Sequence, residues 1–309
     1  MKNIPIRKIK ATQKELVSSE NFSIRDLRTV LSGKDLIDDL HRHDFFLILA
    51  LEKGSGHHEI DFTPYKVADG SIFFMRPGQV HKLTLKAGSQ GYILQFKPDF
   101  YFSHSKHSKE LLRSASINTL IRPETDQAKR VFGILRNIYL EYTSQQEKYE
   151  EVLVANLIIF FIELVRNRKN LDKSGTRTNL YSQERLDELI ELLGTHISNH
   201  KQVSFYADKL NLSLFQLNAI TKKTLGKTCS ELINEHIVLE SKRYLLATSN
   251  QVNQIAYQLG YEDPSYFIRF FKKHTGFSPE VFRHSHKARY VHLNHQNHSR
   301  STRCSHNLL

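Results

Sequence analysis

The fold of the C-terminal part of the chain is decided by residues 255–279, which read IAYQLGYEDPSYFIRFFKKHTGFSP. A short helix, a tight turn, a capping residue and a second helix that ends in a basic pair before a glycine are typical of a helix-turn-helix. Asp263 caps the second helix, and Pro264 suits its first position because proline has no N–H to leave unpaired there. The inward stripe of this helix is expected to be Phe267, Phe270 and Phe271.

The same unit occurs a second time, about fifty residues earlier in the chain. Seven positions match in order, namely Ala207, Leu210, Ser213, Leu217, Lys222, Lys223 and Gly226 with Ala256, Leu259, Asp263, Phe267, Lys272, Lys273 and Gly276. Between the units, Thr228 to Thr248 contains no Gly or Pro, which predicts one helix of about 21 residues, roughly 31 Å long. Because successive major grooves on one face of DNA lie about 34 Å apart, such a rod would set two reading helices into neighbouring grooves. The alternative is a plain helical bundle with solvated basic faces.

Side chains expected to face outward from the two second helices are the candidate DNA contacts. Arg269 suits guanine or phosphate, Asn218 suits adenine, and Phe215 suits a thymine methyl group. Leu214, Leu217 and Ile220 are expected to face inward. The full candidate set is Ser213, Phe215, Gln216, Asn218, Ala219, Lys222 and Lys223 in the first unit and Ser265, Tyr266, Ile268, Arg269 and Lys272 in the second. For each of them the alternative is an ordinary solvated residue.

The amino-acid sequence of the second unit resembles the signature of AraC/XylS-type transcription regulators. The matching segments are Ile255-Ala256, Leu259-Gly260-Tyr261, Asp263 to Phe267, Arg269 to Lys273, Gly276 to Pro279 and Phe282-Arg283. The resemblance spans about 100 residues, Glu184 to Arg283, and implies a seven-helix domain that binds double-stranded promoter DNA, with RNA polymerase as a further partner and activation as the expected effect. The first unit departs from the family, because Ala219 and Thr221 stand where relatives often have Arg and Phe.

The net charge of the chain does not by itself indicate a DNA-binding domain. The whole chain carries +12, yet residues 180–285 contain 12 Lys and Arg against 11 Asp and Glu. Acids such as Glu184 and Glu188 fall on the first helix of this region, away from the reading helices. Binding is therefore expected to depend on where individual basic side chains meet phosphates.

Residues 20–120 have a different pattern. Short apolar runs lie between Gly, Pro and Asp signals, and examples are Phe45 to Leu51, Lys66-Val67, Ser71 to Met75, Lys82 to Leu85 and Gln90 to Phe96. His41-Arg42-His43 before one strand and Arg76 to His81 after another resemble the motifs of cupin barrels and of the sensor domains that precede AraC-type DNA-binding domains. We therefore expect a multi-domain α+β protein: a cupin-like antiparallel β-barrel with following helices, then an all-α domain of two helix-turn-helix units joined by a long helix.

The barrel is expected to sense a small-molecule effector. The candidate pocket residues are His41, His43, Phe46, Phe74, His81 and Phe96. A cupin metal site usually adds a Glu a few residues after the His-x-His pair, but Phe46 and Leu47 stand there, so no metal and no cofactor are expected. Metal binding by the three histidines, a structural role and a role in lining the pocket all remain open. A cupin-type metal-dependent enzyme or sensor with an accessory DNA-binding domain is the alternative function.

Apolar stripes in Asp126 to Tyr142 and Tyr149 to Val165 predict a helix pair. One face is expected to pack on the barrel, and the other either pairs with a second subunit, as in a homodimer, or packs within the domain. The predicted limits are 1–165 for the sensor and dimerisation domain, with helices from about 124 to 165, then 166–179 for the linker, 180–285 for the DNA-binding domain and 286–309 for a basic His-rich tail.

Composition agrees with a cytoplasmic regulator. Cys229 and Cys304 are too few for a disulfide framework, and the longest apolar run, Val152 to Val165, is interrupted by Asn156 and Glu163, so neither secretion nor a membrane span is expected. An alkylation-repair protein would need an activated Cys in a defined motif, whereas Cys229 falls inside the predicted DNA-binding domain. A scaffold that binds no DNA is a further alternative.

Overall fold

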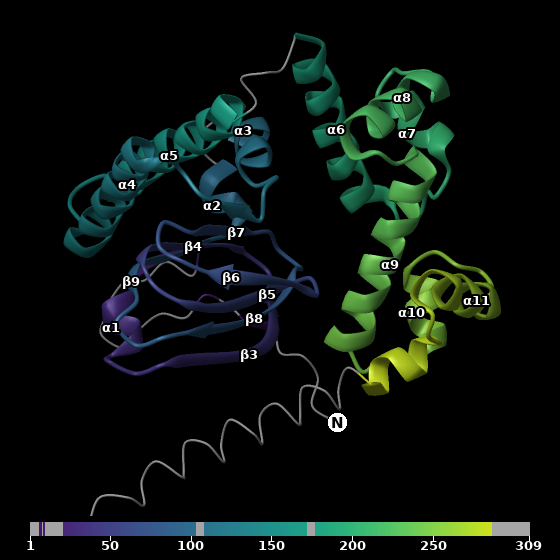
Figure 1. The fold of residues 1–309 in the computed structure, drawn as a ribbon, viewed down its shortest axis with the longest axis horizontal. Helices are drawn as coiled ribbons and strands as arrows, with labels where there is room; N and C mark the ends of the chain where they lie inside the picture. Colours follow the sequence, from purple (N-terminus) through teal and green to yellow (C-terminus); the bar gives the residue numbers. More distant parts are fainter. Residues whose placement is uncertain (1–5, 8, 10–20, 103–107, 172–176, 286–309) are drawn as a thin grey trace, which may run out of the picture. The chain divides into compact units, whose positions relative to one another are not determined.

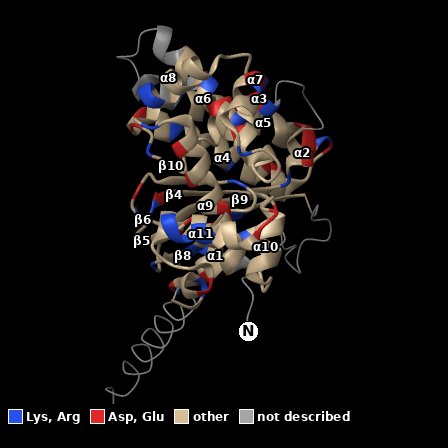
Figure 2. Cartoon of the chain, turned by 90° about the vertical axis from the view of Figure 1, so that its right-hand side faces the viewer, with Lys and Arg blue, Asp and Glu red and all other residues tan. Residues whose placement is uncertain are grey.

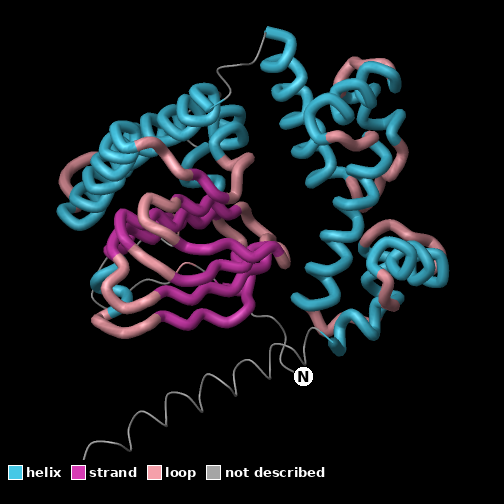
Figure 3. The backbone as a smooth tube through the Cα atoms, viewed as in Figure 1, coloured by secondary structure: helices cyan, strands magenta, loops and turns pink. Residues whose placement is uncertain are grey.

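The protein is described here by a computed structural model, which covers residues 6, 7, 9, 21–102, 108–171 and 177–285. The described residues form two compact units: those up to Asp187, called the barrel unit, and those from Glu188 onward, called the helical unit. Figure 3 shows strands in the barrel unit, whereas the described part of the helical unit consists of helices and loops. The mixture of strands and helices agrees with the expected α+β class.

The barrel unit consists of two five-stranded sheets and the helices that follow them. One sheet has the order β1-β3-β8-β5-β6 and the other β10-β7-β4-β9-β2. The strands are β1 (Ile6–Arg7), β2 (Phe22–Asp26), β3 (Leu36–His43), β4 (Phe46–Lys53), β5 (Gly56–Ile60), β6 (Thr63–Val67), β7 (Ile72–Met75), β8 (Val80–Leu85), β9 (Gln90–Phe96) and β10 (Leu120–Ile121). The helices are α1 (Leu27–Leu31), α2 (Pro98–Phe102), α3 (Ser108–Ala115), α4 (Thr125–Ser144) and α5 (Tyr149–Leu171).

Strand β4 separates two hydrophobic cores because successive side chains of a strand point to opposite faces. Leu47, Leu49 and Leu51 face the other sheet, where they join the core inside the barrel. Ile48 and Ala50 point the opposite way, into a second core with α3, α4 and α5. Figure 1 shows α4 and α5 lying over the sheet that contains β4 and β7. The two helices predicted from their apolar stripes therefore exist and cover one sheet.

Three strands of five or more residues in the barrel were not predicted from the sequence. They are β2, β3 and β5, and β3 includes the His41-Arg42-His43 motif, which was expected to precede a strand. β3 reads LIDDLHRH and β5 reads GHHEI, and both alternate between buried and more exposed positions. Because polar residues on the outer face alternate with apolar residues or histidines on the inner face, neither strand shows a continuous apolar run in the sequence.

The helical unit repeats one arrangement at the two ends of a long helix. Its helices are α6 (Arg177–His196), which crosses the boundary between the units, α7 (Val203–Lys209), α8 (Leu214–Leu225), α9 (Cys229–Ala247), α10 (Val252–Gln258), α11 (Pro264–Thr275) and a last helical segment at 279–285. In Figure 1, α7 and α8 flank one end of α9, and α10 and α11 flank the other. With 19 residues, α9 is about 28 Å long, which confirms the predicted continuous helix.

The buried stripes of α8 and α11 hold them in place. Phe267 and Phe271 are fully buried, and Phe270 is half-buried, as predicted. Leu217 and Ile220 are also buried. Leu214, however, is 51% exposed, so the inward stripe of α8 begins one turn later than predicted and ends with the buried Thr221.

Candidate DNA-binding surface and effector cavity

The first turn of α8 is closed by a capping box. The Ser213 hydroxyl accepts from the Gln216 backbone N–H at 3.2 Å, and the Gln216 side-chain oxygen accepts from the Ser213 N–H at 2.8 Å. Reciprocal bonds of this kind satisfy backbone donors that an α-helix leaves unpaired. Ser213 and Gln216, both candidates for DNA contact, therefore also set the start of the reading helix.

The exposed face of α8 carries most of the side chains predicted to meet DNA. Phe215 is 81% exposed, and Ala219, Lys222 and Lys223 are exposed as well. Phe215 and its neighbour Leu214, which is 51% exposed, together form an apolar surface at the start of α8, as at sites that bind a partner. α8 ends at Gly226, where a left-handed φ of 70° lets the chain turn into α9.

Asn218 does not suit the adenine contact predicted for it. Its amide oxygen accepts from the Cys229 N–H at 3.0 Å, and its amide nitrogen donates to the Leu214 carbonyl at 3.0 Å. Both ends of the amide are thus used inside the protein, and the bond to Cys229 fixes α8 against the first turn of α9. The sequence pattern of α8 could not reveal this role, because the partner lies on the next helix.

The first turn of α11 is also capped by a side chain, but by a different residue. The Asp263 carboxylate accepts from the Ser265 N–H at 2.8 Å, and this hydrogen bond holds the pKa of Asp263 below its usual value. Pro264 occupies the first helical position, as predicted. The outward residues are all exposed, and they are Ser265, Tyr266, Ile268, Arg269 and Lys272.

Basic side chains gather on the two reading helices although the domain is nearly neutral. Residues 210–230 contain Lys but no acid, and so do residues 264–279, which add Arg269. Figure 2 shows the blue of Lys and Arg on α11. The acids lie elsewhere in this part of the chain, for example Glu231 and Glu235 on α9. Local placement therefore gives each reading helix a positive surface without a strongly charged domain.

A contact between the segment before α7 and the turn between α10 and α11 links the two helix-turn-helix units. The Lys201 ammonium donates to the Gly260 carbonyl at 2.9 Å and lies 4.7 Å from the centre of the Tyr261 ring. Gly260 has a φ of +69°, and a Cβ atom there would lie 1.7 Å from the Ser198 carbonyl oxygen. Glycine at this position thus allows the two helix-turn-helix units to contact each other. We call this contact the Gly260 joint.

The Cys229 thiol does not have the environment of a reactive cysteine. The side chain is fully buried, and burial raises the pKa of this thiol to about 11. Nucleophilic cysteines need a lowered pKa and access to their substrate, so Cys229 does not fit the alkylation-repair alternative. Cys304 lies outside the described residues.

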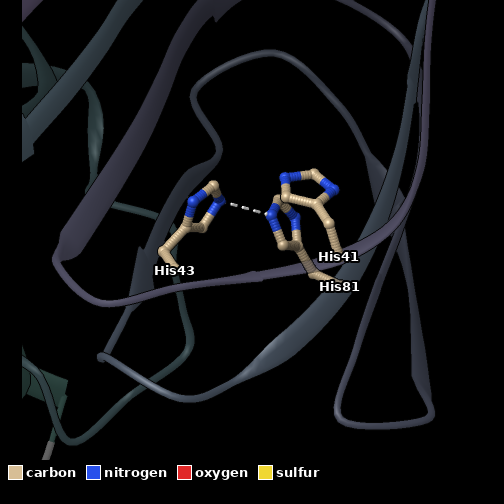
Figure 4. Close-up of side chains that lie close together, drawn as sticks. All are labelled: His41, His43 and His81. Atoms are coloured by element: carbon tan, nitrogen blue, oxygen red, sulfur yellow. Dashed lines mark hydrogen bonds between the residues drawn. The ribbon is translucent and has the colours of Figure 1, made fainter. Parts of the chain in front are cut away.

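Inside the barrel, neighbouring strands bring four histidines together. His41 on β3 is the register partner of His81 on β8, and His58 on β5 reaches the same ring. The ring nitrogens His43 Nε2 and His81 Nε2 are 2.7 Å apart, and His58 Nε2 lies 2.9 Å from His81 Nδ1. Figure 4 shows the rings of His41, His43 and His81 clustered beside one another. All four side chains are at most 5% exposed.

His58 was not among the predicted pocket residues. Its ring is buried against both His81 and Phe73, with centroids 5.2 and 4.7 Å away. The alternation in GHHEI, where one histidine of the pair must point inward, is the signal that could have revealed it. His57, its neighbour, is exposed.

Burial keeps these histidines neutral at ordinary pH. It lowers the pKa of His43 and of His58 to about 3, and it holds the pKa of His81 well below the usual value. Burial also lowers the pKa of His41, against the opposing effect of the Asp39 carbonyl. Each ring therefore has one N–H and one lone pair, so each can donate one hydrogen bond and accept another.

A cavity of about 190 Å³ lies beside the cluster. Its wall includes His41, His43 and His81, the polar side chains Arg7, Arg25, Asp38 and Gln95, and apolar residues such as Phe45, Leu47, Leu49 and Leu83. Pockets for drug-sized ligands usually measure about 300–1,000 Å³, so this cavity suits a compact ligand.

The three phenylalanines that were predicted to line the pocket lie on the opposite face of their sheet, away from the cavity. Phe46 stacks on Phe96 with ring centroids 5.1 Å apart, and Phe74 stacks on Phe161 of α5 at 5.7 Å. All of them belong to, or pack against, the core beneath the helices. In strand β4 the inward positions are 47, 49 and 51, so Phe46 must point away from the cavity. Phe45, one residue earlier, lines it instead.

Comparison with known proteins gives two family matches and a set of relatives. Residues 206–285 match the model of a helix-turn-helix domain, and residues 35–158 match that of the AraC-like ligand binding domain. The HTH-type transcriptional activator RhaS of Escherichia coli O1:K1 / APEC is 26% identical over 259 residues, covering 79% of this chain and 86% of the relative. RhaS of Citrobacter koseri is 26% identical over 258 residues with the same coverage.

Solved structures of other proteins are also similar to this chain. ToxT from Vibrio cholerae is 14% identical and covers 85% of this chain and 98% of its own, with a TM-score of 0.41. The DNA-binding domain of AdpA in complex with a target DNA is 21% identical and covers 34% of this chain and 94% of its own, with a TM-score of 0.32.

The order of the two matched models along the chain agrees with the order of its two units, a ligand-binding barrel first and paired helix-turn-helix units second. The relatives matched over most of their length are transcriptional activators, which supports the regulator interpretation and not the enzyme alternative. The chain belongs to the AraC/XylS family of sequence-specific DNA-binding transcriptional regulators.

Proposed function

We propose that this regulator activates transcription from promoters at which one chain reads two adjacent major grooves. The observation that carries the proposal is the pair of exposed helices, α8 and α11, each capped at its start and closed by glycine, at opposite ends of one rigid helix. The relatives named as activators support activation rather than repression. RNA polymerase is the proposed protein partner, because activation of transcription requires it. The proposed location is the cytoplasm, where a bacterial-type promoter lies.

The proposed base and phosphate contacts are the candidates that are exposed on the two reading helices. On α11 they are Ser265, Tyr266, Ile268, Arg269 and Lys272, and on α8 they are Phe215, Ala219, Lys222 and Lys223, with Ser213 and Gln216 at its start. Asn218 is left out because its amide is engaged by Leu214 and Cys229. The proposed DNA-binding domain keeps the limits 180–285.

Arg269→Ala is expected to weaken binding to the specific site by about 10- to 100-fold, the effect of losing one bidentate contact to guanine. Arg269→Lys keeps the charge but loses the planar fork, so it should relax the preference for one base while leaving the salt dependence of binding unchanged. The measurement is recovery of genomic fragments by the purified protein at two salt concentrations, followed by titration of the recovered motif. If Arg269→Ala left the motif and its affinity unaltered, α11 would not read DNA as proposed.

We also propose that the predicted sensor domain, residues 1–165, binds a small effector in the cavity of the barrel and passes the signal through the predicted linker, residues 166–179. The cavity has polar and apolar walls and adjoins the histidine cluster, as a site for a compact polar ligand should. No catalytic role is proposed, because the relatives are regulators. None of the helices in the described ranges is long and apolar enough to cross a membrane.

Homodimerisation through α4 and α5 is the proposed source of a second copy on the promoter. Leu140, Val152 and Ile159 are 52, 38 and 49% exposed, and two shallow hollows that share Leu140 lie between the helices. Large apolar side chains gathered on one helix pair are typical of an interaction surface. Charged residues such as Lys129, Arg136 and Glu141 border it, as in the rim of an interface.

Leu140→Glu is expected to convert the dimer to a monomer, with a rise of at least about 30-fold in the dimer dissociation constant, because it places a charge in the centre of the apolar surface. Analytical ultracentrifugation of the full chain measures this directly. Glu141→Gln, a change at the adjacent position on the border, is the control and should leave the dimer intact. A wild-type chain that is monomeric at all concentrations tested would refute the proposed interface.

A further inference from the structure

Three rings of the histidine cluster bring one nitrogen each close together, an arrangement that is not needed merely to line a cavity. One ring nitrogen from each of His41, His43 and His81 lies within 4.8 Å of the others. Figure 4 shows these three rings side by side, and all three side chains are buried. The Asp38 carboxylate lies nearby, with one oxygen 3.7 Å from His41 Nε2, but it pairs with Arg7 and is not one of the three converging donors.

Hydrogen bonds inside the protein decide which nitrogen of His41 can act as a ligand. His41 Nδ1 lies 2.6 Å from the Asp39 carbonyl oxygen. Because a carbonyl can only accept, the proton sits on Nδ1 and the lone pair on Nε2. Ligating histidines usually have their second nitrogen held by a carbonyl or carboxylate in this way.

His58 can do the same for His81. Its Nε2 lies 2.9 Å from His81 Nδ1, so a proton on His81 Nδ1 would be accepted by His58 and would leave the lone pair of His81 on Nε2. His43 Nδ1 has no hydrogen-bond partner among the described residues, so its tautomer follows whatever its Nε2 contacts. Three lone pairs can therefore point into one space.

We propose that His41, His43 and His81 bind a divalent transition-metal ion of the zinc class. His58 and the Asp39 carbonyl act as positioning groups that orient His81 and His41. Neutral imidazole is a preferred ligand of such ions, and three protein ligands leave a coordination position open. All three histidines line the cavity. The inference rests on the proposed function only in assigning that cavity to the effector, which would be the metal itself or a compact group that coordinates it.

The distances require small side-chain movements. Two nitrogens that share a tetrahedral zinc at about 2.0–2.1 Å lie about 3.3 Å apart. The 2.7 Å separation between His43 Nε2 and His81 Nε2 must therefore widen by about 0.6 Å, and the hydrogen bond between them is replaced by two bonds to the ion. The widest pair must approach by at most about 1.5 Å, which rotation of an imidazole about its χ angles allows.

This inference departs from the sequence, where the missing Glu after His43 predicts no metal. Of the two positions where the Glu would stand, Phe46 points away from the cluster and Leu47 lines the cavity, so this segment supplies no carboxylate. His58, from a strand that was not predicted, joins the histidines instead. A donor set made only of nitrogen disfavours Mg²⁺ and Ca²⁺, which prefer oxygen ligands.

The test uses the full-length chain, stripped with a chelator and titrated with Zn²⁺ alone. Six histidines in the C-terminal region would bind zinc adventitiously, so all samples carry Gln at His284, His286, His292, His295, His298 and His306. We expect one Zn²⁺ per chain by calorimetry, together with a rise in the barrel's Tm of roughly 5–10 °C at a hundredfold excess over Kd. Co²⁺ should give a visible spectrum of a nitrogen-ligated site.

Variants separate ligands from positioning groups. His43→Gln and His81→Gln should each abolish stoichiometric binding, while His57→Gln, at an exposed position on the same strand as His58, should leave it unchanged. His58→Gln should retain one site but weaken it by about 10- to 100-fold, the usual effect of losing an outer partner of a ligand. Circular dichroism and thermal unfolding of the metal-free chains confirm that each variant is folded.

Absence of stoichiometric Zn²⁺ in the wild type, or equal binding by His43→Gln and His57→Gln, would overturn the metal site. DNA recovery with the same samples is an independent readout. Specific DNA binding without zinc binding would reject this inference and leave the proposed function standing, whereas zinc binding without specific DNA binding would do the reverse.

Discussion

Gly260→Ala is expected to destabilise the helical unit by about 2–5 kcal/mol and to reduce specific DNA affinity at least tenfold. Two effects add at this position. The φ of +69° disfavours any residue with a Cβ, and that Cβ would lie 1.7 Å from the Ser198 carbonyl oxygen, a backbone atom that cannot rotate away. The segment around Lys201 must therefore move, which breaks the Gly260 joint and releases one reading helix from the other.

Gly226→Ala is a closely matched control for this prediction. Gly226 has a φ of +70°, but a Cβ there would meet nothing within 4 Å. It should therefore show only the backbone effect, about 1–2 kcal/mol. Urea unfolding of both variants, with titration of a DNA site that spans both grooves and of one that spans a single groove, makes the comparison. Equal losses in the two variants would mean that the joint does not hold the units together.

Phe74→Ala is expected to destabilise the barrel unit by about 3–5 kcal/mol, the usual effect of truncating a fully buried aromatic ring. Phe74, on β7, is 1% exposed, and its ring centroid lies 5.7 Å from that of Phe161 on α5. The cavity left behind would open between the sheet and the helices, not in the effector cavity. Ligand or metal affinity of the chains that remain folded should therefore stay the same.

Phe74→Leu and Phe45→Leu complete this experiment. Phe74→Leu should lose much less stability, because a branched aliphatic side chain refills most of the space. Phe45 lines the effector cavity, so Phe45→Leu should alter ligand affinity even where stability is little changed. Thermal unfolding reports stability, and calorimetry reports binding. If Phe74→Ala altered affinity as strongly as Phe45→Leu, the assignment of the two faces would be wrong.

The helix-turn-helix units could be predicted from the sequence because their signals are local. The capping residue, the proline at the first turn and the closing glycine all lie within fifteen residues of one another, and they specify α11 without reference to the rest of the chain. The length of α9 followed from the lack of Gly and Pro in the same way. Leu214 and Asn218 escaped prediction, since their surroundings depend on how α8 meets its neighbours.

The barrel was harder to predict because its site is assembled from strands far apart in sequence. The histidine motifs were recognised, but the face of each neighbouring residue depends on strand register, and the three phenylalanines were assigned to the wrong side. His58 lies on a strand rich in polar residues that carries little of the usual apolar signal. Pairing of β5 with β8, which brings His58 to His81, is a long-range property that the sequence pattern does not specify.

The continuous α9 also restricts how this regulator can change its target. A helix turns by about 100° and rises 1.5 Å for each residue, so inserting one residue in α9 would swing one reading helix to a different side of the DNA as well as moving it along the axis. Angular phase and distance are therefore tied together, and single insertions are not gradual steps toward a new operator spacing. New spacings between binding sites must come instead from the connection between the units or from the pairing of two chains, while the pitch within one chain stays fixed.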